Sequence, residues 1–211
     1  MTTYSVKEIF YTLQGEGRHA GRAAVFCRFT GCNLWSGRER NRKTAICNFC
    51  DTDFVGIDGV GGGRFRTAAA LAKAISDAWI GQGGRPFVVM TGGEPLLQVD
   101  EPLVDALHAL EFEVAVETNG TLPAPAGVDW IAVSPKAHAR LEVLQGDELK
   151  LVYPQAEAPP ERFEDLAFTH HLLQPMDGPH LAANTAAAVA YCLANPRWRL
   201  SLQSHKVLGI P

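Results

Sequence analysis

Three of the five cysteines in the chain, Cys32, Cys47 and Cys50, follow the spacing C-x14-C-x2-C. Two thiolates separated by two residues can face one metal centre from a single tight turn. A structural zinc ion takes four protein ligands, so three cysteines leave one coordination position open. The pattern therefore favours a metal cluster, or a metal ion, that must also bind another molecule.

The other two cysteines bear on this interpretation. Cys27 lies five residues before Cys32 and could complete a zinc knuckle, which would make the chain a non-enzymatic zinc-binding module. However, Cys27 stands between Phe26 and Arg28 in an apolar stretch, where a cysteine is more often a small buried hydrophobe. Cys192 falls on a predicted helix and is expected in the core. We favour the three-cysteine site and keep the zinc module as an alternative.

Length and composition narrow the class of protein. The 211 residues, 46% hydrophobic and 20% charged, are typical of one globular domain with a full core. The net charge of −4 argues against broad binding to nucleic acid or a membrane surface. No apolar run is long enough to span a bilayer, and the first residues lack the order of a signal peptide. An odd cysteine number fits a reducing cytoplasm.

Short apolar strands alternate with amphipathic helices along the chain. Helices are expected after the cap residue Thr67, at residues 100–110, and after the cap residue Asn184. Strands are expected at residues 6–11, 23–29, 86–90, 112–117, 130–133, 149–153, 170–173 and 199–203. Such strands are typical of a parallel sheet with covered faces, but the chain is too short for a complete eight-unit barrel. We predict an α/β fold: a truncated, open, TIM-like partial barrel of about six parallel strands with about three main helices.

Polar and small residues follow these strands rather than precede them. They form the motifs Gly92-Gly93-Glu94-Pro95, Glu117-Thr118-Asn119-Gly120, Ser134-Pro135-Lys136 and Gln174-Pro175-Met176-Asp177. Because the carboxyl ends of parallel strands meet at one edge, sites form there in barrels and doubly wound sheets. The sequence therefore predicts one site that combines these motifs with the cysteines.

Taken together, the motifs resemble those of radical S-adenosylmethionine (SAM) enzymes. Within them, the chain is most similar to the 7-carboxy-7-deazaguanine synthase family. The supporting segments are residues 10–17 (Phe-Tyr-Thr-Leu-Gln-Gly-Glu-Gly), 28–35 (Arg-Phe-Thr-Gly-Cys-Asn-Leu-Trp), 50–52 (Cys-Asp-Thr) and 209–211 (Gly-Ile-Pro). There are two departures: fourteen residues separate the first two cysteines instead of three, and Phe49 replaces a frequent tryptophan.

The resemblance implies a lyase of queuosine and 7-deazapurine biosynthesis. It would convert 6-carboxy-5,6,7,8-tetrahydropterin to 7-carboxy-7-deazaguanine with release of ammonia, by a radical generated on the cofactor rather than by a catalytic side chain. It also implies an electron donor such as flavodoxin and a homodimer. Residues 1–211 would be one radical SAM domain, whose N-terminal strand and loop and C-terminal tail close the substrate pocket. Another small radical SAM enzyme, such as a glycyl-radical activase, is an alternative.

The resemblance also implies roles for individual residues. Cys32, Cys47 and Cys50 would hold a [4Fe–4S] cluster, and Thr52 would be a ligand of Mg²⁺. SAM would be bound by Phe49, Cys50, Gly93, Glu94, Glu117, Ser134, Pro135, Lys136, Gln174 and Asp177. Substrate would be bound by Leu13, Gln14, Gly15, Glu16, Arg28, Thr91, His205 and Pro211.

Arg28 and the basic segment at residues 38–43 are expected to have different roles. Arg28 lies in an apolar strand, where an unpaired charge is costly, and its guanidinium could grip a substrate carboxylate with two parallel hydrogen bonds. A structural ion pair is the alternative for this arginine. The basic segment at residues 38–43, between the first and second cysteines, is expected to be a solvated loop.

Overall fold

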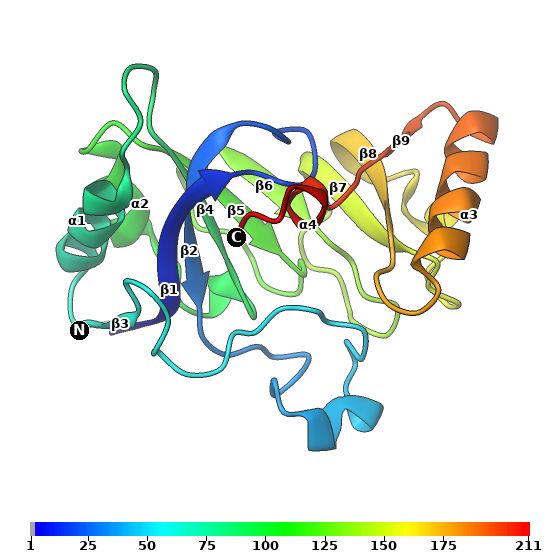
Figure 1. The fold of residues 1–211 in the computed structure, drawn as a ribbon, viewed down its shortest axis with the longest axis horizontal. Coiled ribbons are helices and arrows are strands. Elements are labelled where there is room, and N and C mark those ends of the chain that lie inside the picture. Colours follow the sequence, from blue (N-terminus) through cyan, green and yellow to red (C-terminus); the bar gives the residue numbers. More distant parts are fainter. Residues whose placement is uncertain (1–2) are drawn as a thin grey trace.

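The computed structural model describes residues 3–211, so the first two residues of the predicted domain lie outside it. The described chain is built on a nine-stranded sheet in the order β3-β1-β2-β4-β5-β6-β7-β8-β9 (Figure 1). The strands are β1 (Tyr4–Leu13), β2 (Ala23–Phe29), β3 (Gly63–Phe65), β4 (Phe87–Gly92), β5 (Glu113–Thr118), β6 (Trp130–Val133), β7 (Gln145–Tyr153), β8 (Ala167–Pro175) and β9 (Trp198–Leu200).

Strand pairing confirms the open, partial barrel. From β2 to β9 each neighbouring pair is parallel, whereas β1 is antiparallel to both β2 and β3. The parallel part has seven strands, β2 and β4 to β9, compared with the roughly six that the sequence predicted. Since β3 and β9 are the two edges and do not pair with each other, the barrel stays open.

Helices cover the outer face of the sheet. Figure 1 shows α1 (Ala68–Ala78) and α2 (Glu101–His108) at one end and α3 (Leu181–Ala194) at the other. Thr67 caps α1 as predicted, and its side-chain oxygen accepts from the Ala70 amide at 3.1 Å. Asp100, expected as the first residue of the second helix, instead caps α2 and accepts from the Leu103 amide at 3.2 Å. In the part that the structure describes, no helix combines the length and apolarity needed to cross a bilayer.

Side chains of β2 alternate between the helices and the barrel interior. Cys27 is fully buried in the core that β1, β2, β4 and β5 form with α1 and α2. Its neighbour Phe26 belongs to a separate cluster with Phe87 and Trp130, which fills part of the barrel interior. This alternation turns Arg28 toward the interior and excludes Cys27 as a fourth ligand beside the other cysteines.

Two local predictions were wrong, and one short helix was missed. Asn184 does not cap α3: the helix begins after His180, and the Asn184 side chain donates to the Met176 carbonyl at 2.8 Å. A further short helix, α4 (Ser204–Leu208), follows β9. The basic segment is not simply a solvated loop, because it contains a 3₁₀ helix (Glu39–Thr44) whose Arg42 binds other parts of the chain.

Candidate active site

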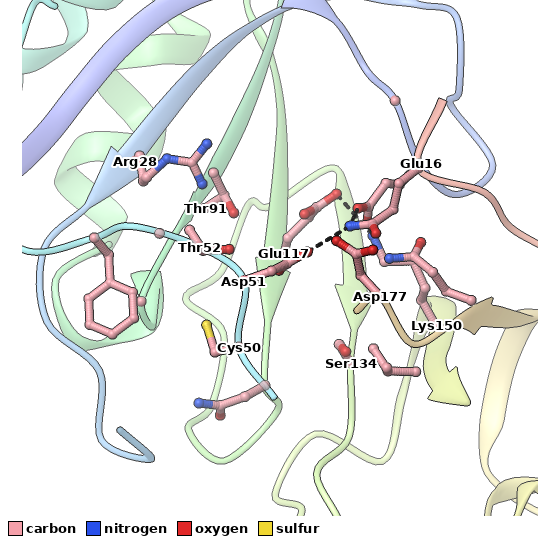
Figure 2. A pocket seen from close by; sticks show the side chains of 18 of the residues that line it. Glu16, Arg28, Cys50, Asp51, Thr52, Thr91, Glu117, Ser134, Lys150 and Asp177 are labelled. Atoms are coloured by element: carbon pink, nitrogen blue, oxygen red, sulfur yellow. Dashed lines mark hydrogen bonds and ion pairs between the residues drawn. The ribbon is translucent and has the colours of Figure 1, made fainter. Parts of the chain in front are cut away.

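A cavity of about 370 Å³ lies at the carboxyl ends of the parallel strands (Figure 2). Its volume falls within the usual range for small-molecule sites. Glu94 and Pro135 do not line it. All the other predicted site residues do: Leu13, Gln14, Gly15, Glu16, Arg28, Cys32, Cys47, Phe49, Cys50, Thr52, Thr91, Gly93, Glu117, Ser134, Lys136, Gln174, Asp177, His205 and Pro211.

The three cysteines converge on one wall of this cavity. A hydrogen bond from the Cys47 thiol lowers the pKa of Cys50 to about 6 and raises the pKa of Cys47 itself. The Cys32 sulfur accepts from the Leu34 amide at 3.4 Å. Within residues 3–211, no three sulfur, carboxylate or imidazole groups lie close enough to share a single metal ion. A cubane cluster binds each cysteine through a different iron, so three cysteines on one wall suit a [4Fe–4S] cluster whose fourth iron is open to another ligand.

The turn after β4 brings the strand end against the first cysteine. A side chain at Gly93 would collide with the Gly31 carbonyl and would lie 2.9 Å from the Cys32 β-carbon. Gly92 has a φ of 134°, a backbone conformation that favours glycine. The two glycines are therefore required for close contact between two parts of this chain.

Glu94 is fully buried and holds two strand ends together. One of its carboxylate oxygens accepts from the Leu96 amide at 2.9 Å and from the Thr118 hydroxyl at 2.7 Å, and the other accepts from the Asn119 amide at 2.8 Å. Burial raises the pKa of Glu94 although these donors oppose the shift. Because its oxygens are taken by protein donors, this carboxylate joins the ends of β4 and β5. Gly92 and Gly93, not Glu94, are the residues of this turn that line the cavity.

A buried lysine organises the opposite wall. Lys150 on β7 is only 5% exposed, and its ammonium lies 2.5 Å from Glu16 and 3.4 Å from Glu117. Gln14 donates to the same Glu117 oxygen at 2.9 Å, and Gln203 donates to Glu16 at 2.9 Å. Figure 2 shows Glu16, Glu117 and Lys150 gathered on this side of the cavity.

The charges in this network stabilise one another. Burial by itself lowers the pKa of Lys150, but the charges of Glu117 and Glu16 outweigh it and raise the pKa. Burial would raise the pKa of Glu16, but Lys150 outweighs it and lowers the pKa. Sequence reasoning found Glu16, Gln14 and Glu117 but missed Lys150. A lysine inside the apolar run at residues 149–153 was the available signal.

A second ammonium lies where the cysteine turn meets the end of β6. Lys136 donates to the carbonyl and the hydroxyl of Ser134, both at 2.7 Å, and lies 5.8 Å from the centre of the Phe49 ring. Burial lowers the pKa of Lys136. A cation in this position suits the carboxylate of an amino-acid ligand.

Arg28 and two threonines occupy the far side of the cavity. The register of β2 with β4 sets Arg28 beside Thr91, and Figure 2 shows Thr52 close to both. The Arg28 Nε donates to Glu8 at 2.7 Å, so the structural ion pair exists, although the side chain also lines the cavity. The ion pair that the sequence left open is therefore present, and the substrate-binding role of Arg28 stays a prediction.

Residues 203–211, which we call the C-terminal clasp, lie over the glycine-containing loop after β1. The amide and hydroxyl of Ser204 donate to the Gly15 carbonyl at 2.9 and 2.8 Å, and Thr12 donates to the Pro211 carbonyl at 3.1 Å. A side chain at Gly15 would collide with His205. The clasp thus packs against a position where only glycine fits.

Lys206 of the clasp links the cysteine turn to the end of β8. Its ammonium lies 2.6 Å from both Asp51 and Asp177. Gln203 also donates to Asp51 at 3.1 Å. Of these four residues the sequence pointed to Asp177 and, within the Cys-Asp-Thr segment, to Asp51. It did not point to Gln203 or Lys206, because contacts of a short terminal helix carry no sequence signal.

An open parallel barrel with three cysteines beside the strand ends is the architecture of a radical SAM enzyme. The model of the radical SAM superfamily matches residues 41–186, and the chain belongs to that superfamily. The match begins between the first and second cysteines, so Cys32 lies outside it. This boundary agrees with the unusual length of the loop.

Relatives that match along nearly their whole length show which family within this superfamily the chain belongs to. The chain is 65% identical to 7-carboxy-7-deazaguanine synthase of Bordetella pertussis and 64% identical to that of Bradyrhizobium diazoefficiens, each over 208 residues and 99% of both chains. The crystal structure of QueE from Escherichia coli has a TM-score of 0.70 and 28% identity, over 96% of this chain and 95% of that one. This chain therefore belongs to the 7-carboxy-7-deazaguanine synthase family.

This membership confirms the predicted family, fold, lyase class and use of a [4Fe–4S] cluster with SAM. Neither the glycyl-radical activase nor the zinc-binding module is retained. Roles of individual residues, Mg²⁺, the electron donor and the assembly state are taken up as proposals.

Proposed function

We propose that this protein converts 6-carboxy-5,6,7,8-tetrahydropterin to 7-carboxy-7-deazaguanine and ammonia in queuosine and 7-deazapurine biosynthesis. The single observation that carries the proposal is the cavity itself. It places Cys32, Cys47 and Cys50 opposite polar residues from the strand ends, with charged groups suited to a carboxylated, hydrogen-bonding ligand. Family membership supplies the reaction.

When bound, the reduced [4Fe–4S] cluster and SAM supply radical chemistry that removes and returns a hydrogen atom at the substrate. The three cysteines would hold three irons and leave the fourth to the cofactor. Lys136 provides an ammonium for the cofactor carboxylate, and the Phe49 ring packs beside it. The other proposed cofactor contacts are Gly93, Glu117, Ser134, Gln174 and Asp177.

Arg28 and Thr52 would hold the substrate carboxylate. Glu8 binds the Nε of Arg28 and fixes the guanidinium, whose terminal nitrogens form a fork that suits a carboxylate. The Thr52 hydroxyl would be a ligand of Mg²⁺, which prefers oxygen and leaves places for substrate oxygens. Thr91, beside Arg28, would add a further contact.

The pterin ring would lie against the Gln14–Glu16 loop. Glu16 accepts from Lys150 and Gln203, which keep it ionised and oriented as a hydrogen-bond acceptor. Leu13, Gly15, His205 and Pro211 would complete the substrate pocket, and the clasp would exclude water. We further propose a small electron carrier such as flavodoxin as reductant, a homodimer, and action in the cytoplasm.

Anaerobic turnover tests this proposal. Reconstituted and reduced protein with SAM and Mg²⁺ should convert the carboxytetrahydropterin to 7-carboxy-7-deazaguanine, with one ammonia released for each product. Cys50→Ala should abolish turnover, whereas Cys192→Ser, on the outer helix, should not. Unchanged substrate in the presence of an intact, reducible cluster would overturn the proposed activity.

Thr52→Ala tests the magnesium site separately. The variant should need more Mg²⁺ or lose its Mg²⁺ dependence, and it should keep the iron content of the parent. Thr185→Ala on α3 is the matched control and should behave as the parent does. Loss of the cluster in Thr52→Ala would contradict the assignment of Thr52 to Mg²⁺.

A further inference from the structure

The long segment between the first and second cysteines folds back onto the cysteine turn. It contains a 3₁₀ helix, Glu39–Thr44, and four basic residues, Arg38, Arg40, Arg42 and Lys43. Arg38, Arg40 and Lys43 are exposed, whereas Arg42 is half-buried. This difference separates Arg42 from the rest of the basic segment.

Arg42 binds the backbone of the turn that carries Cys47 and Cys50. One terminal nitrogen of its guanidinium donates to the Asn48 carbonyl at 3.0 Å and to the Cys50 carbonyl at 2.9 Å. The other two nitrogens donate to Glu39, at 2.8 Å from Nε and 2.5 Å from Nη2. Glu39 therefore fixes the orientation in which the guanidinium meets the turn.

The same guanidinium stacks on the segment that follows the first cysteine. Its central carbon lies 4.1 Å from the centre of the Trp35 ring, which is 6% exposed and contacts Phe54 edge-on. The backbone adds a weaker link, because the Leu34 carbonyl accepts from the amides of Ile46 and Cys47 at 3.1 and 3.4 Å. Arg42 thus contacts both branches of the cysteine site.

We propose that Arg42 is a positioning residue that sets the Cys47–Cys50 turn relative to Cys32. With fourteen residues between the first two cysteines, chain connectivity alone does not fix their relative position. The Arg42 guanidinium supplies the missing constraint, because it donates to two carbonyls of the turn and stacks on Trp35. Lysine cannot reproduce this planar contact, because its ammonium is a compact point charge.

Cluster retention measures this role directly. Arg42→Gln should release iron to a chelator about tenfold faster than the parent, since it loses charge-assisted hydrogen bonds to the turn. Arg42→Lys should lie between the two. Arg40→Gln, which removes the same charge from an exposed position in the same helix, should match the parent. The reduced-cluster electron paramagnetic resonance spectrum should change in Arg42→Gln but not in Arg40→Gln.

Three results would decide against this role. The first is an Arg42→Gln variant that matches Arg40→Gln in both iron release and spectrum, and the second is an Arg42→Lys variant that restores the parent's rate in full. A much lower melting temperature for apo Arg42→Gln than for apo Arg40→Gln would make Arg42 a general folding residue instead. The inference rests on the cluster of the proposed function. A parent protein that holds no cluster would refute that function, whereas a stable parent cluster with no effect at Arg42 would refute only this inference.

Discussion

The two walls of the cavity are built in different ways. On one wall, Glu117 and Lys150 stand on β5 and β7, and their positions follow from the parallel register of the sheet. On the other, residues 32–54 form loops and one 3₁₀ helix, with few buried side chains: Leu34, Trp35, Cys47 and Phe54. The strand wall is positioned by the whole core, whereas the cysteine wall depends on a small number of specific contacts.

The two walls of the cavity therefore have different roles in the site. A preformed strand wall can hold charged groups in fixed positions for cofactor and substrate. The cysteine wall must accept a cluster, and it is held from outside by Arg42 and from the clasp by Lys206. We therefore expect substitutions on the strand wall to cost folding stability, and those on the cysteine wall to change ligand retention and affinity.

The largest effect on folding stability should come from Lys150→Met. It removes a buried cation and leaves the half-buried Glu16 and Glu117 without their partner, and breaking a buried pair in this way costs about 3 kcal/mol. Urea unfolding of the apo protein at neutral pH measures this loss. Lys73→Met breaks an exposed pair with Asp77 and should cost less than about 1 kcal/mol. Equal effects from the two variants would contradict a special role for the strand wall.

Glu16→Gln should reduce folding stability less than Lys150→Met does, and this loss should depend on pH. Lys150 lowers the pKa of Glu16 in the folded protein. Its stabilisation is therefore present above the ordinary glutamate pKa of about 4.3 and lost as pH falls through the lower folded value. The variant should be about 2 kcal/mol less stable than the parent at neutral pH. This deficit should shrink in acid, and a constant deficit across pH would argue against the ion pair.

Lys206→Ala should have the smallest effect on stability. The Lys206 side chain is 38% exposed, so its pairs with Asp51 and Asp177 should contribute less than about 1 kcal/mol. Its main effect should be a several-fold higher KM, because the clasp holds the cysteine turn and the end of β8 together. Lys43→Ala is the exposed control. An unchanged KM in Lys206→Ala would show that the clasp does not close the cavity.

Sequence reasoning recovered the motifs at the strand ends, Glu117 among them, because their signals are local. Continuous apolar runs marked β4 and β5, and the motifs after them lie at the cavity as expected. The cap at Thr67 was likewise predicted from the helical pattern that follows it, and Asp100 marked the start of the second helix. Asn184 was misread because the same residue type serves inside a helix when its amide meets a nearby carbonyl, here that of Met176.

The missed features depend on contacts distant in sequence. Lys150 was read as part of an apolar strand, and its partner Glu16 lies 134 residues away. The helix α4 is short and leaves Val207 and Leu208 exposed, so it has no amphipathic pattern. Arg42 was indistinguishable from its basic neighbours until the turn that it binds was placed beside it.

Hydrogen–deuterium exchange with and without the reconstituted cluster tests the contrast between the walls most directly. Amides of residues 32–52 should exchange rapidly in the apo protein and become protected when the cluster is bound. Amides of β5 and β7 should exchange slowly in both states, because the sheet forms them without the cluster. Equal protection of both walls in the apo protein would contradict the account, as would a cluster that protects β5 and β7 but leaves residues 32–52 unchanged.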